Sequence, residues 1–229
     1  MRAIVIGLGG IGSNVVDSLC RKLSFSKSIK KADRVILVDG DKYEEKNRER
    51  QRFTSCANKA EATKEWLLVN FPDLQIEAKP RYVDDKNIFL FVKEGDVVFC
   101  CVDNHATRKL VSDHMRTLEN GLLISGGNEL YDGEIQIYER RDGKDFTPPL
   151  TYHPEIEFPK DKNPAELSCG EIVASGGTQL LAVNLMVATL MLNAYALWLE
   201  MGELPYTECY FDFKSGNVRP VKRRCLTEG

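Results

Sequence analysis

The chain contains no Cys-x-x-Cys pair, although its 229 residues include seven cysteines. Structural zinc sites are commonly built from such pairs, so we expect no structural zinc. The cysteines form an odd and irregularly spaced set, which gives no disulfide framework and favours a reducing compartment, the cytoplasm. Histidine is also scarce, and His105, His114 and His153 are too scattered along the chain to suggest a metal cluster.

An excess of positive charge is absent too. The 31 Lys and Arg residues and the 34 Asp and Glu residues give a formal net charge of −3, which implies no general electrostatic affinity for nucleic acid. The longest apolar stretch, residues 180–199, is interrupted by Asn184, Thr189 and Asn193, so we expect a buried helix and no membrane association. The first apolar run already begins at Arg2, and we therefore expect no signal peptide.

With 43% hydrophobic residues, the sequence predicts one α/β domain over residues 1–229. Apolar runs alternate with helical patterns in residues 1–125, which is typical of a parallel, Rossmann-like sheet that binds nucleotides. We expect strands at 2–6, 34–38, 75–78, 96–101 and 122–125, and helices at about 13–22, 58–70 and 106–119. Residues 126–229 are expected to add an antiparallel strand at 133–138, an irregular crossover at 140–164, a helix at 175–200 and a hairpin of strands 208–213 and 218–222.

A glycine-rich turn follows the first expected strand. Gly7, Gly9 and Gly12 form a G-x-G-x-x-G set, with Gly10 inside it, where a strand passes into a helix. Such glycines allow the backbone to approach a phosphate, and the helix N-terminus offers it free N–H groups. The alternative is a tight packing turn that binds no ligand.

Asp39 ends the second expected strand, and Asp41 follows it closely. A carboxylate at this position is placed to accept hydrogen bonds from the ribose hydroxyls of a nucleotide. The alternative is a cap within the turn Asp39-Gly40-Asp41. The preceding glycine turn favours the ribose contact.

A dense charged run occupies residues 42–52. A solvated helix face is the usual explanation of such a run, but Asn47, Arg50 and Gln51 occur together here. An arginine at this place is able to neutralise nucleotide phosphates, as phosphoryl and adenylyl chemistry requires. Lys59, at the start of the next expected helix, is a candidate for a second positive charge at the phosphates, and Lys64 is the alternative candidate for this role.

Asp103 and Asn104 follow the expected strand that ends at Cys101. Ligands bind at this carboxyl edge of the sheet in open α/β folds. A lone carboxylate beside phosphates suits magnesium, which takes few protein ligands and completes its shell with phosphate oxygens and water. The alternative is that Asp103 or Asn104 caps the following helix. Arg108 is expected to orient the Asp103 carboxylate.

Together these elements resemble the ThiF/MoeB family of adenylating enzymes, whose superfamily includes the ubiquitin-activating enzymes. The family pattern combines a G-x-G-G-x-G-S turn, an acid after the second strand, N-x-x-R-Q, a lysine-led helix and D-N-x-x-x-R. This chain has the five elements in order, at Gly7–Ser13, Asp39, Asn47–Gln51, Lys59–Ala62 and Asp103–Arg108. The later half is similar as well, with Ser125–Gly127 and Gly176–Gln179.

The resemblance implies a reaction between Mg-ATP and a ubiquitin-like or sulfur-carrier protein with a C-terminal glycine. The tail carboxylate attacks the α-phosphate, pyrophosphate leaves and an acyl-adenylate forms. By this resemblance Arg50 and Lys59 neutralise phosphates, Asp103 holds magnesium and Asp39 binds ribose. The remaining motif residues are expected to form the nucleotide pocket: Gly7, Gly9, Gly10, Gly12, Asp41, Asn47, Gln51, Asn104 and Arg108.

Some members of the family then transfer the activated tail to a cysteine. Cys169 is the candidate here, because it precedes a helix N-terminus in the expected crossover. A small buried residue is the alternative at this position. Cys209 is expected in the core, and Cys225, in a basic tail, is a more distant candidate.

Other interpretations stay open. An NAD-dependent oxidoreductase would use the same glycine turn, although it would not need Arg50, Lys59 and Asp103 together. Adenylation of a small molecule or an RNA base, or a catalytically inactive scaffold, would fit the same fold. Many relatives carry an N-terminal helical arm, which we do not expect here. We expect a homodimer. The long apolar helix at 175–200 either contributes to the dimer interface as well as to the core, or belongs to the core alone.

Overall fold

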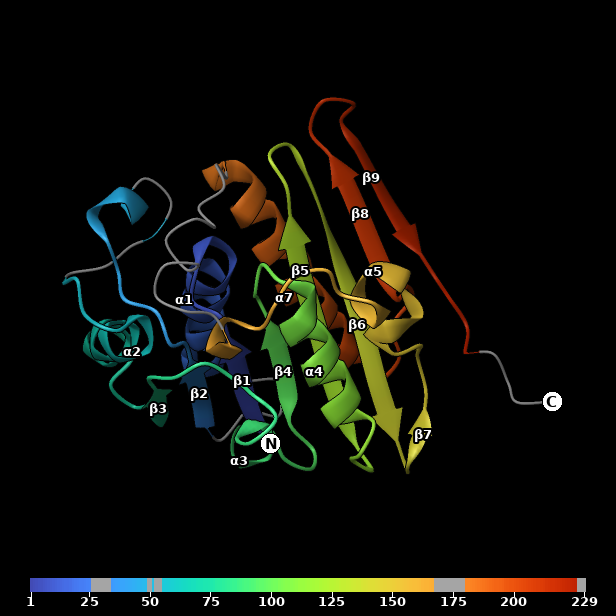
Figure 1. Cartoon of the computed structure of the whole chain (residues 1–229), viewed down its shortest axis with the longest axis horizontal. Helices are drawn as coiled ribbons and strands as arrows, with labels where there is room; N and C mark the ends of the chain where they lie inside the picture. The colour runs from blue at the N-terminus through green and yellow to red at the C-terminus, as the bar shows by residue number, and fades with distance from the viewer. Residues whose placement is uncertain (26–33, 49–50, 52–54, 167–179, 226–229) are drawn as a thin grey trace.

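The computed structural model describes residues 1–25, 34–48, 51, 55–166 and 180–225. A nine-stranded sheet runs through these residues in the order β3-β2-β1-β4-β5-β6-β8-β9, with β7 paired to β6 (Figure 1). The strands are β1 (Arg2–Ile6), β2 (Arg34–Val38), β3 (Ile76–Lys79), β4 (Val97–Cys100), β5 (Gly121–Asn128), β6 (Asp132–Arg141), β7 (Lys144–Asp145), β8 (Glu208–Asp212) and β9 (Asn217–Val221).

Strands β3, β2, β1, β4 and β5 pair in parallel, and β6 to β9 add antiparallel pairs. The central strand β1 shows why its half of the sheet is apolar throughout. Ala3 and Val5 belong to one hydrophobic cluster, whereas Ile4 and Ile6 belong to the cluster on the opposite face. A strand buried on both faces needs an apolar residue at every position. The predicted fold, a mostly parallel Rossmann-like sheet with antiparallel strands in the C-terminal half, is confirmed.

Helices cover both faces of this sheet (Figure 1). One hydrophobic cluster includes residues of α1, α2 and α7, and the other includes residues of α3, α4 and α5. The helices are α1 (Gly10–Phe25), α2 (Lys59–Asn70), α3 (Ile88–Phe91), α4 (His105–Met115), α5 (Pro154–Glu157) and α7 (Leu181–Met201), with 3-10 turns η1 (Glu45–Asn47), η2 (Leu150–Tyr152) and η3 (Pro164–Glu166).

Helix α7 is the long apolar helix that the sequence predicts. Val183, Val187 and Met191 are fully buried where the helix packs on β5 and α1, whereas Leu181 and Leu185 are 45% and 43% exposed. The core burial that the sequence predicts is present on one side of α7, and the other side of the helix forms an outer surface of the single chain. With 21 residues and a mean hydropathy of 1.6, α7 is long and apolar enough to cross a membrane. It is the one helix of this kind among the described residues.

Some expected boundaries near the candidate site were wrong. Helix α1 begins at Gly10, three residues before the expected Ser13, so part of the glycine turn is helical. Strand β5 continues to Asn128 because its antiparallel pairing with β6 extends to the end of the hairpin. The expected irregular crossover contains the short elements η2 and α5, whose Leu150 and Ile156 fill the core.

Candidate active site

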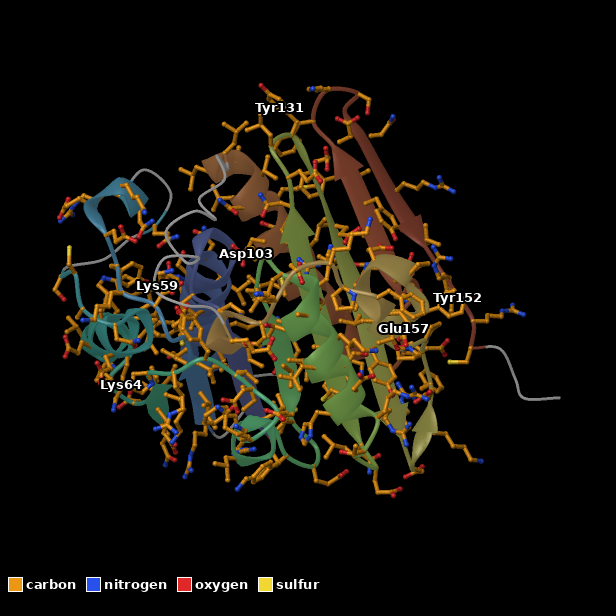
Figure 2. All side chains as sticks on the ribbon, in the orientation of Figure 1. Lys59, Lys64, Asp103, Tyr131, Tyr152 and Glu157 are labelled. Atoms are coloured by element: carbon orange, nitrogen blue, oxygen red, sulfur yellow. The ribbon has the colours of Figure 1, made fainter. Side chains whose placement is uncertain are left out.

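A cavity of about 770 Å³ opens at the carboxyl ends of β1, β2 and β4. It is lined by the β1–α1 turn, the β2–α2 segment, the β4–α4 loop and the β5–β6 hairpin, and Figure 2 labels Lys59 and Asp103 in it. Most candidates from the sequence line it: Gly7, Gly9, Gly10, Asp39, Asp41, Asn47, Gln51, Lys59, Asp103, Asn104 and Arg108. Arg50 and Cys169 lie outside the described residues.

The glycine turn is held by close backbone contacts. Gly7 has a φ of +85°, and a Cβ on it would lie 2.9 Å from the carbonyl oxygen of Cys101. A Cβ on Gly12 would lie 1.9 Å from the carbonyl oxygen of Gly7, so α1 can start this close to β1 only without a side chain there. The nearest neighbour of a Cβ on Gly9 would be Nε2 of Gln51, at 3.9 Å. Packing explains Gly7 and Gly12, whereas Gly9 borders open space in the cavity.

The N-terminus of α1 is suited to an anion. The helix begins at Gly10 with no acidic residue in its first turn, and its first N–H groups have no partners inside the helix. Such a terminus attracts phosphate. By contrast, Asp161 accepts the first two N–H groups of α4 at 2.8 and 2.9 Å, and Asn104 caps the same turn at 2.8 Å. Among the described residues no group accepts the first N–H groups of α1, so of these two helix ends α1 is the one left open to an anion.

Asp39 is buried at the end of β2, with 7% of its surface exposed. Its Oδ2 accepts the N–H of Leu8 at 2.6 Å, and its Oδ1 accepts the N–H of Asp41 at 2.8 Å. Burial raises the pKa of Asp39, against the opposing charge of Lys59. The turn cap considered from the sequence is therefore present. A carboxylate has about four acceptor positions, so each oxygen keeps capacity for a ribose hydroxyl.

Lys59 supplies a buried cation at the β2–α2 side of the cavity. Its Nζ lies 2.9 Å from Oδ2 of Asp41, whose Oδ1 accepts the hydroxyl of Tyr82. Burial by itself lowers the pKa of Lys59, but the carboxylates of Asp39 and Asp41 more than offset this, and the net pKa is raised. Lys59 is therefore charged at neutral pH. Lys64, the substitute candidate on the same helix, does not line the cavity (Figure 2).

Two asparagines fix the segment between β2 and α2. Asn58 donates to the carbonyl oxygens of Asp39 and Asp41 at 2.9 and 3.0 Å, and its Oδ1 caps α2. Asn47 Oδ1 accepts a backbone N–H of its own turn at 2.9 Å, and its carbonyl accepts the N–H of Gln51 at 2.9 Å. This turn brings Gln51 to the cavity, where its buried Oε1 has no hydrogen-bond partner. Asn47 thus shapes the site through the backbone.

Asp103 is exposed at the cavity wall, in the loop after β4. The sequence allowed either Asp103 or Asn104 to cap α4, and the structure shows that Asn104 is the cap. The Asp103 carboxylate is therefore available to a ligand. No three His, Cys, Asp or Glu side chains among the described residues are grouped to hold a metal ion. Magnesium bound to a nucleotide needs few protein ligands, so one free carboxylate fits it.

Arg108 has a different contact from the one expected. Its guanidinium donates to the carbonyl oxygens of Val102 and Gly126 at 3.1 Å each and lies 3.7 Å from Glu134 Oε1. A Cβ on Gly127 would lie 2.3 Å from this group. Arg108 therefore joins the β4–α4 loop to the end of β5 and does not orient the Asp103 carboxylate as predicted. Gly127 leaves room for this contact, whereas a Cβ on Gly126 would meet Met191 and Val187 of α7.

Several cavity residues were missed from the sequence. Tyr82 follows β3 at the same carboxyl edge as Asp39, so its position in the chain was a usable signal. Asn163, which lines the cavity, lies in the crossover and donates to the carbonyl oxygen of Val83 at 2.9 Å, and Asp161 nearby in the crossover caps α4. These contacts depend on how the crossover returns over the sheet, which no local pattern reveals.

Of the described cysteines, Cys20, Cys100, Cys101 and Cys209 are buried and Cys56 is exposed. Cys100 and Cys101 belong to opposite hydrophobic clusters, and burial raises the pKa of both thiols. Cys209 is buried, as predicted. Cys225 is only partly exposed, and its Sγ donates to the carbonyl oxygen of Asp145 at 3.1 Å.

Comparison with known proteins gives consistent matches. The model of the ThiF family matches residues 1–227. The adenylyltransferase and sulfurtransferase MOCS3 of Drosophila yakuba is 27% identical over 226 residues, which cover 96% of this chain and 46% of MOCS3. The chain thus spans about half the length of this curated relative.

Solved structures share the fold. E. coli MccB with MccA-N7isoASN superposes with a TM-score of 0.74 at 17% identity, covering 99% of this chain and 66% of MccB. E. coli MccB with ATP gives a TM-score of 0.69 at 16% identity, covering 99% of this chain and 65% of MccB. The family match extends over nearly the whole sequence, and the chain belongs to the ThiF family.

Proposed function

We propose that this chain is one adenylation domain that uses Mg-ATP to activate the C-terminal glycine of a ubiquitin-like or sulfur-carrier protein. One observation carries the proposal. The N-terminus of α1, which no described side chain caps, the buried cation of Lys59 and the exposed carboxylate of Asp103 meet in one cavity. The names of the relatives, an adenylyltransferase and a structure of MccB with ATP, agree with this chemistry.

The reaction forms one bond and breaks another. A carboxylate oxygen of the tail attacks the α-phosphorus of ATP, and the bond from that phosphorus to the bridging oxygen of pyrophosphate breaks. The products are an acyl-adenylate and pyrophosphate. The nucleophile is already an anion, so the site needs no general base. It must stabilise the charge that develops on the phosphates and the leaving group.

The residues divide this task by position. The first turn of α1 and Lys59 bind phosphate oxygens, and Arg50 of the same motif adds a further cation. Asp39 binds ribose hydroxyls with its remaining acceptor positions. Asp103 would hold magnesium, which neutralises phosphate charge when it is bound. Arg108 keeps the loop with Asp103 in place through Val102.

An NAD-dependent oxidoreductase is the alternative that shares the glycine turn. A dinucleotide carries no terminal triphosphate, so a site for NAD has little use for Lys59 or for a free carboxylate at Asp103. Binding of NAD in place of ATP would favour this alternative. Adenylation of a small molecule or RNA base would keep the same ATP site, and only the second substrate would distinguish it.

Three further features belong to the same proposal. We propose a cytoplasmic homodimer, for which the half-exposed Leu181 and Leu185 of α7 offer an apolar surface.

Cys169 is the proposed acceptor of the activated tail, with which it would form a thioester. A covalent adduct with the carrier that is sensitive to dithiothreitol and absent in Cys169→Ala would support this step. An adduct that persists in the variant would exclude Cys169.

ATP–pyrophosphate exchange tests the central reaction. Small proteins ending in Gly-Gly are offered with ATP, magnesium and labelled pyrophosphate. We expect exchange that depends on magnesium and is lost in Arg50→Ala, Lys59→Ala and Asp103→Ala, but retained in the matched control Lys64→Ala. Exchange that survives the first three changes would show that the site assignment is wrong.

A further inference from the structure

A carboxylate lies among the groups that would meet the phosphates of a nucleotide. Asp41 lines the cavity beside Lys59, and 40% of its side chain is exposed. Its charge helps to keep Lys59 protonated, but a carboxylate that faces the cavity would also repel a triphosphate. The way in which each oxygen of Asp41 is bound therefore decides how well this side of the cavity accepts ATP.

Both oxygens of Asp41 have a partner. Oδ2 lies 2.9 Å from Nζ of Lys59, and Oδ1 accepts the hydroxyl of Tyr82. The ring of Tyr82 lies over Gly40, where an added Cβ would lie 2.6 Å from it. Burial, together with the bond to Asp41, raises the pKa of Tyr82, so its hydroxyl keeps the proton and acts as the donor. Tyr82 thus covers the oxygen of Asp41 that Lys59 does not hold.

The chain after β3 is fixed so that Tyr82 reaches Asp41. Strand β3 pairs with β2 in parallel, and the segments that follow the two strands leave the sheet at one edge (Figure 1). The side chain of Asn87 donates to the carbonyl oxygen of Tyr82 at 3.0 Å. The side chain of Asn163 donates to the carbonyl oxygen of Val83 at 2.9 Å. Both asparagines are buried, so the protein itself holds this segment in place.

On the basis of the proposed use of ATP, we propose that Tyr82 is a positioning residue for the triphosphate. Its hydroxyl directs Asp41 toward Lys59 and stabilises the charge of the second oxygen, which would otherwise face the phosphates. Asp41 then occupies one of the three donors of Lys59, and the others remain for phosphate oxygens. The contribution of Tyr82 to binding should therefore increase with the number of phosphates on the nucleotide, and it should depend on the charge of Asp41.

Nucleotide affinity in Tyr82→Phe tests this role. The variant keeps the ring over Gly40 and loses only the hydroxyl. Affinities for ATP, ADP and AMP are measured by displacement calorimetry in the presence of magnesium. We expect ATP to bind about tenfold more weakly than to the wild type, because a hydrogen bond to a charged group is lost. ADP should lose less affinity, and AMP should change by less than about twofold, because repulsion by Asp41 increases with the charge of the ligand.

Tyr138→Phe is the matched control. Tyr138 also donates its hydroxyl to an aspartate, Asp145, at 2.6 Å, but it lies in β6 and does not line the cavity. Its removal should leave the three nucleotide affinities unchanged. Circular dichroism checks that both variants fold.

A double-mutant cycle with Asp41→Asn separates the charge of Asp41 from the structure of the loop. The asparagine oxygen still accepts the hydroxyl of Tyr82, but it carries no charge to repel phosphates. In the Asp41→Asn background, Tyr82→Phe should therefore change ATP affinity by less than about twofold. Equal losses in the two backgrounds, or equal losses for ATP and AMP, would overturn the inference. Failure of the wild-type protein to bind ATP would instead overturn the proposed function.

Discussion

The ammonium group of Lys59 lies 2.9 Å from the carboxylate of Asp41, whose other oxygen is bonded to Tyr82. The pair sits at the carboxyl end of β2, next to the buried carboxylate of Asp39. Because these two carboxylates raise the pKa of Lys59 against the effect of burial, the cation is stable at neutral pH. Lysine has three donors, so one bond to Asp41 leaves others for phosphate oxygens. The site is thus arranged before a nucleotide enters.

The first prediction concerns this cation. Lys59→Met should lower kcat/KM for ATP–pyrophosphate exchange by about 100-fold, the usual loss when one preorganised donor to developing charge is removed. Lys64→Met, on the same helix and outside the cavity, is the control and should stay close to the wild type. Circular dichroism checks that both variants fold. An equal loss in both variants, or no loss in Lys59→Met, would contradict the role of Lys59.

The second prediction separates packing from ligand binding in the glycine turn. Gly12→Ala should destabilise the protein by about 3 kcal/mol, because the added carbon would meet the carbonyl oxygen of Gly7 at 1.9 Å. Gly9→Ala has open space and should change the free energy of unfolding by less than about 0.5 kcal/mol. It should nevertheless weaken ATP binding, because the methyl group enters the cavity. Urea unfolding and calorimetry measure the two effects. Equal destabilisation by both changes would refute the distinction.

Local patterns predicted the parts of this protein that are local in the chain. The apolar runs of β1, β2 and β4 are buried on both faces, and the residues that follow them, among them Asp39 and Asp103, line one cavity. This succeeded because the carboxyl ends of parallel strands meet at one edge of the sheet. Lys59 was found for the same reason, as it opens the helix after β2.

Contacts between distant segments were not predictable in this way. Arg108 was expected to reach Asp103, five residues away, but it contacts Gly126 of the neighbouring strand. Asp161 caps α4 from 56 residues away. Both contacts depend on strand order and on the path of the crossover, which helix and strand periodicity do not determine.

The third prediction is a pH dependence of stability. His153 Nε2 lies 2.8 Å from Glu208 Oε1, and this hydrogen bond raises the pKa of His153 above 6.5 although burial opposes it. The native state therefore holds the proton more tightly than the unfolded chain does, and its extra stability is complete below about pH 6.5. It is lost as the pH rises through the raised pKa of His153.

We expect His153→Gln to be less stable than the wild type by about 2 kcal/mol at pH 5.5, with the difference shrinking in alkaline solution. Urea unfolding at a series of pH values measures this. A difference between the two proteins that is constant from pH 5.5 to 9.5 would contradict the assigned ion pair.

The fourth prediction concerns the cap of α4. Asp161 accepts the N–H groups of His105 and Ala106, and it thereby fixes the first turn after the Asp103 loop. Asp161→Ala should lower the free energy of unfolding by about 1 kcal/mol, the usual effect of losing a helix cap. Asp113→Ala, which removes an exposed ion pair with Lys109 on the same helix, should cost less than about 0.5 kcal/mol.

The same two variants, Asp161→Ala and Asp113→Ala, should differ in the magnesium concentration that ATP–pyrophosphate exchange requires. If Asp161 holds the Asp103 loop, Asp161→Ala should require more magnesium for half-maximal exchange, while the maximal rate at saturating magnesium falls little. Asp113→Ala should leave the magnesium requirement unchanged, because Asp113 lies away from the loop on the exposed side of α4. A variant that loses stability without any change in the magnesium titration would show that Asp161 supports the helix but does not position Asp103.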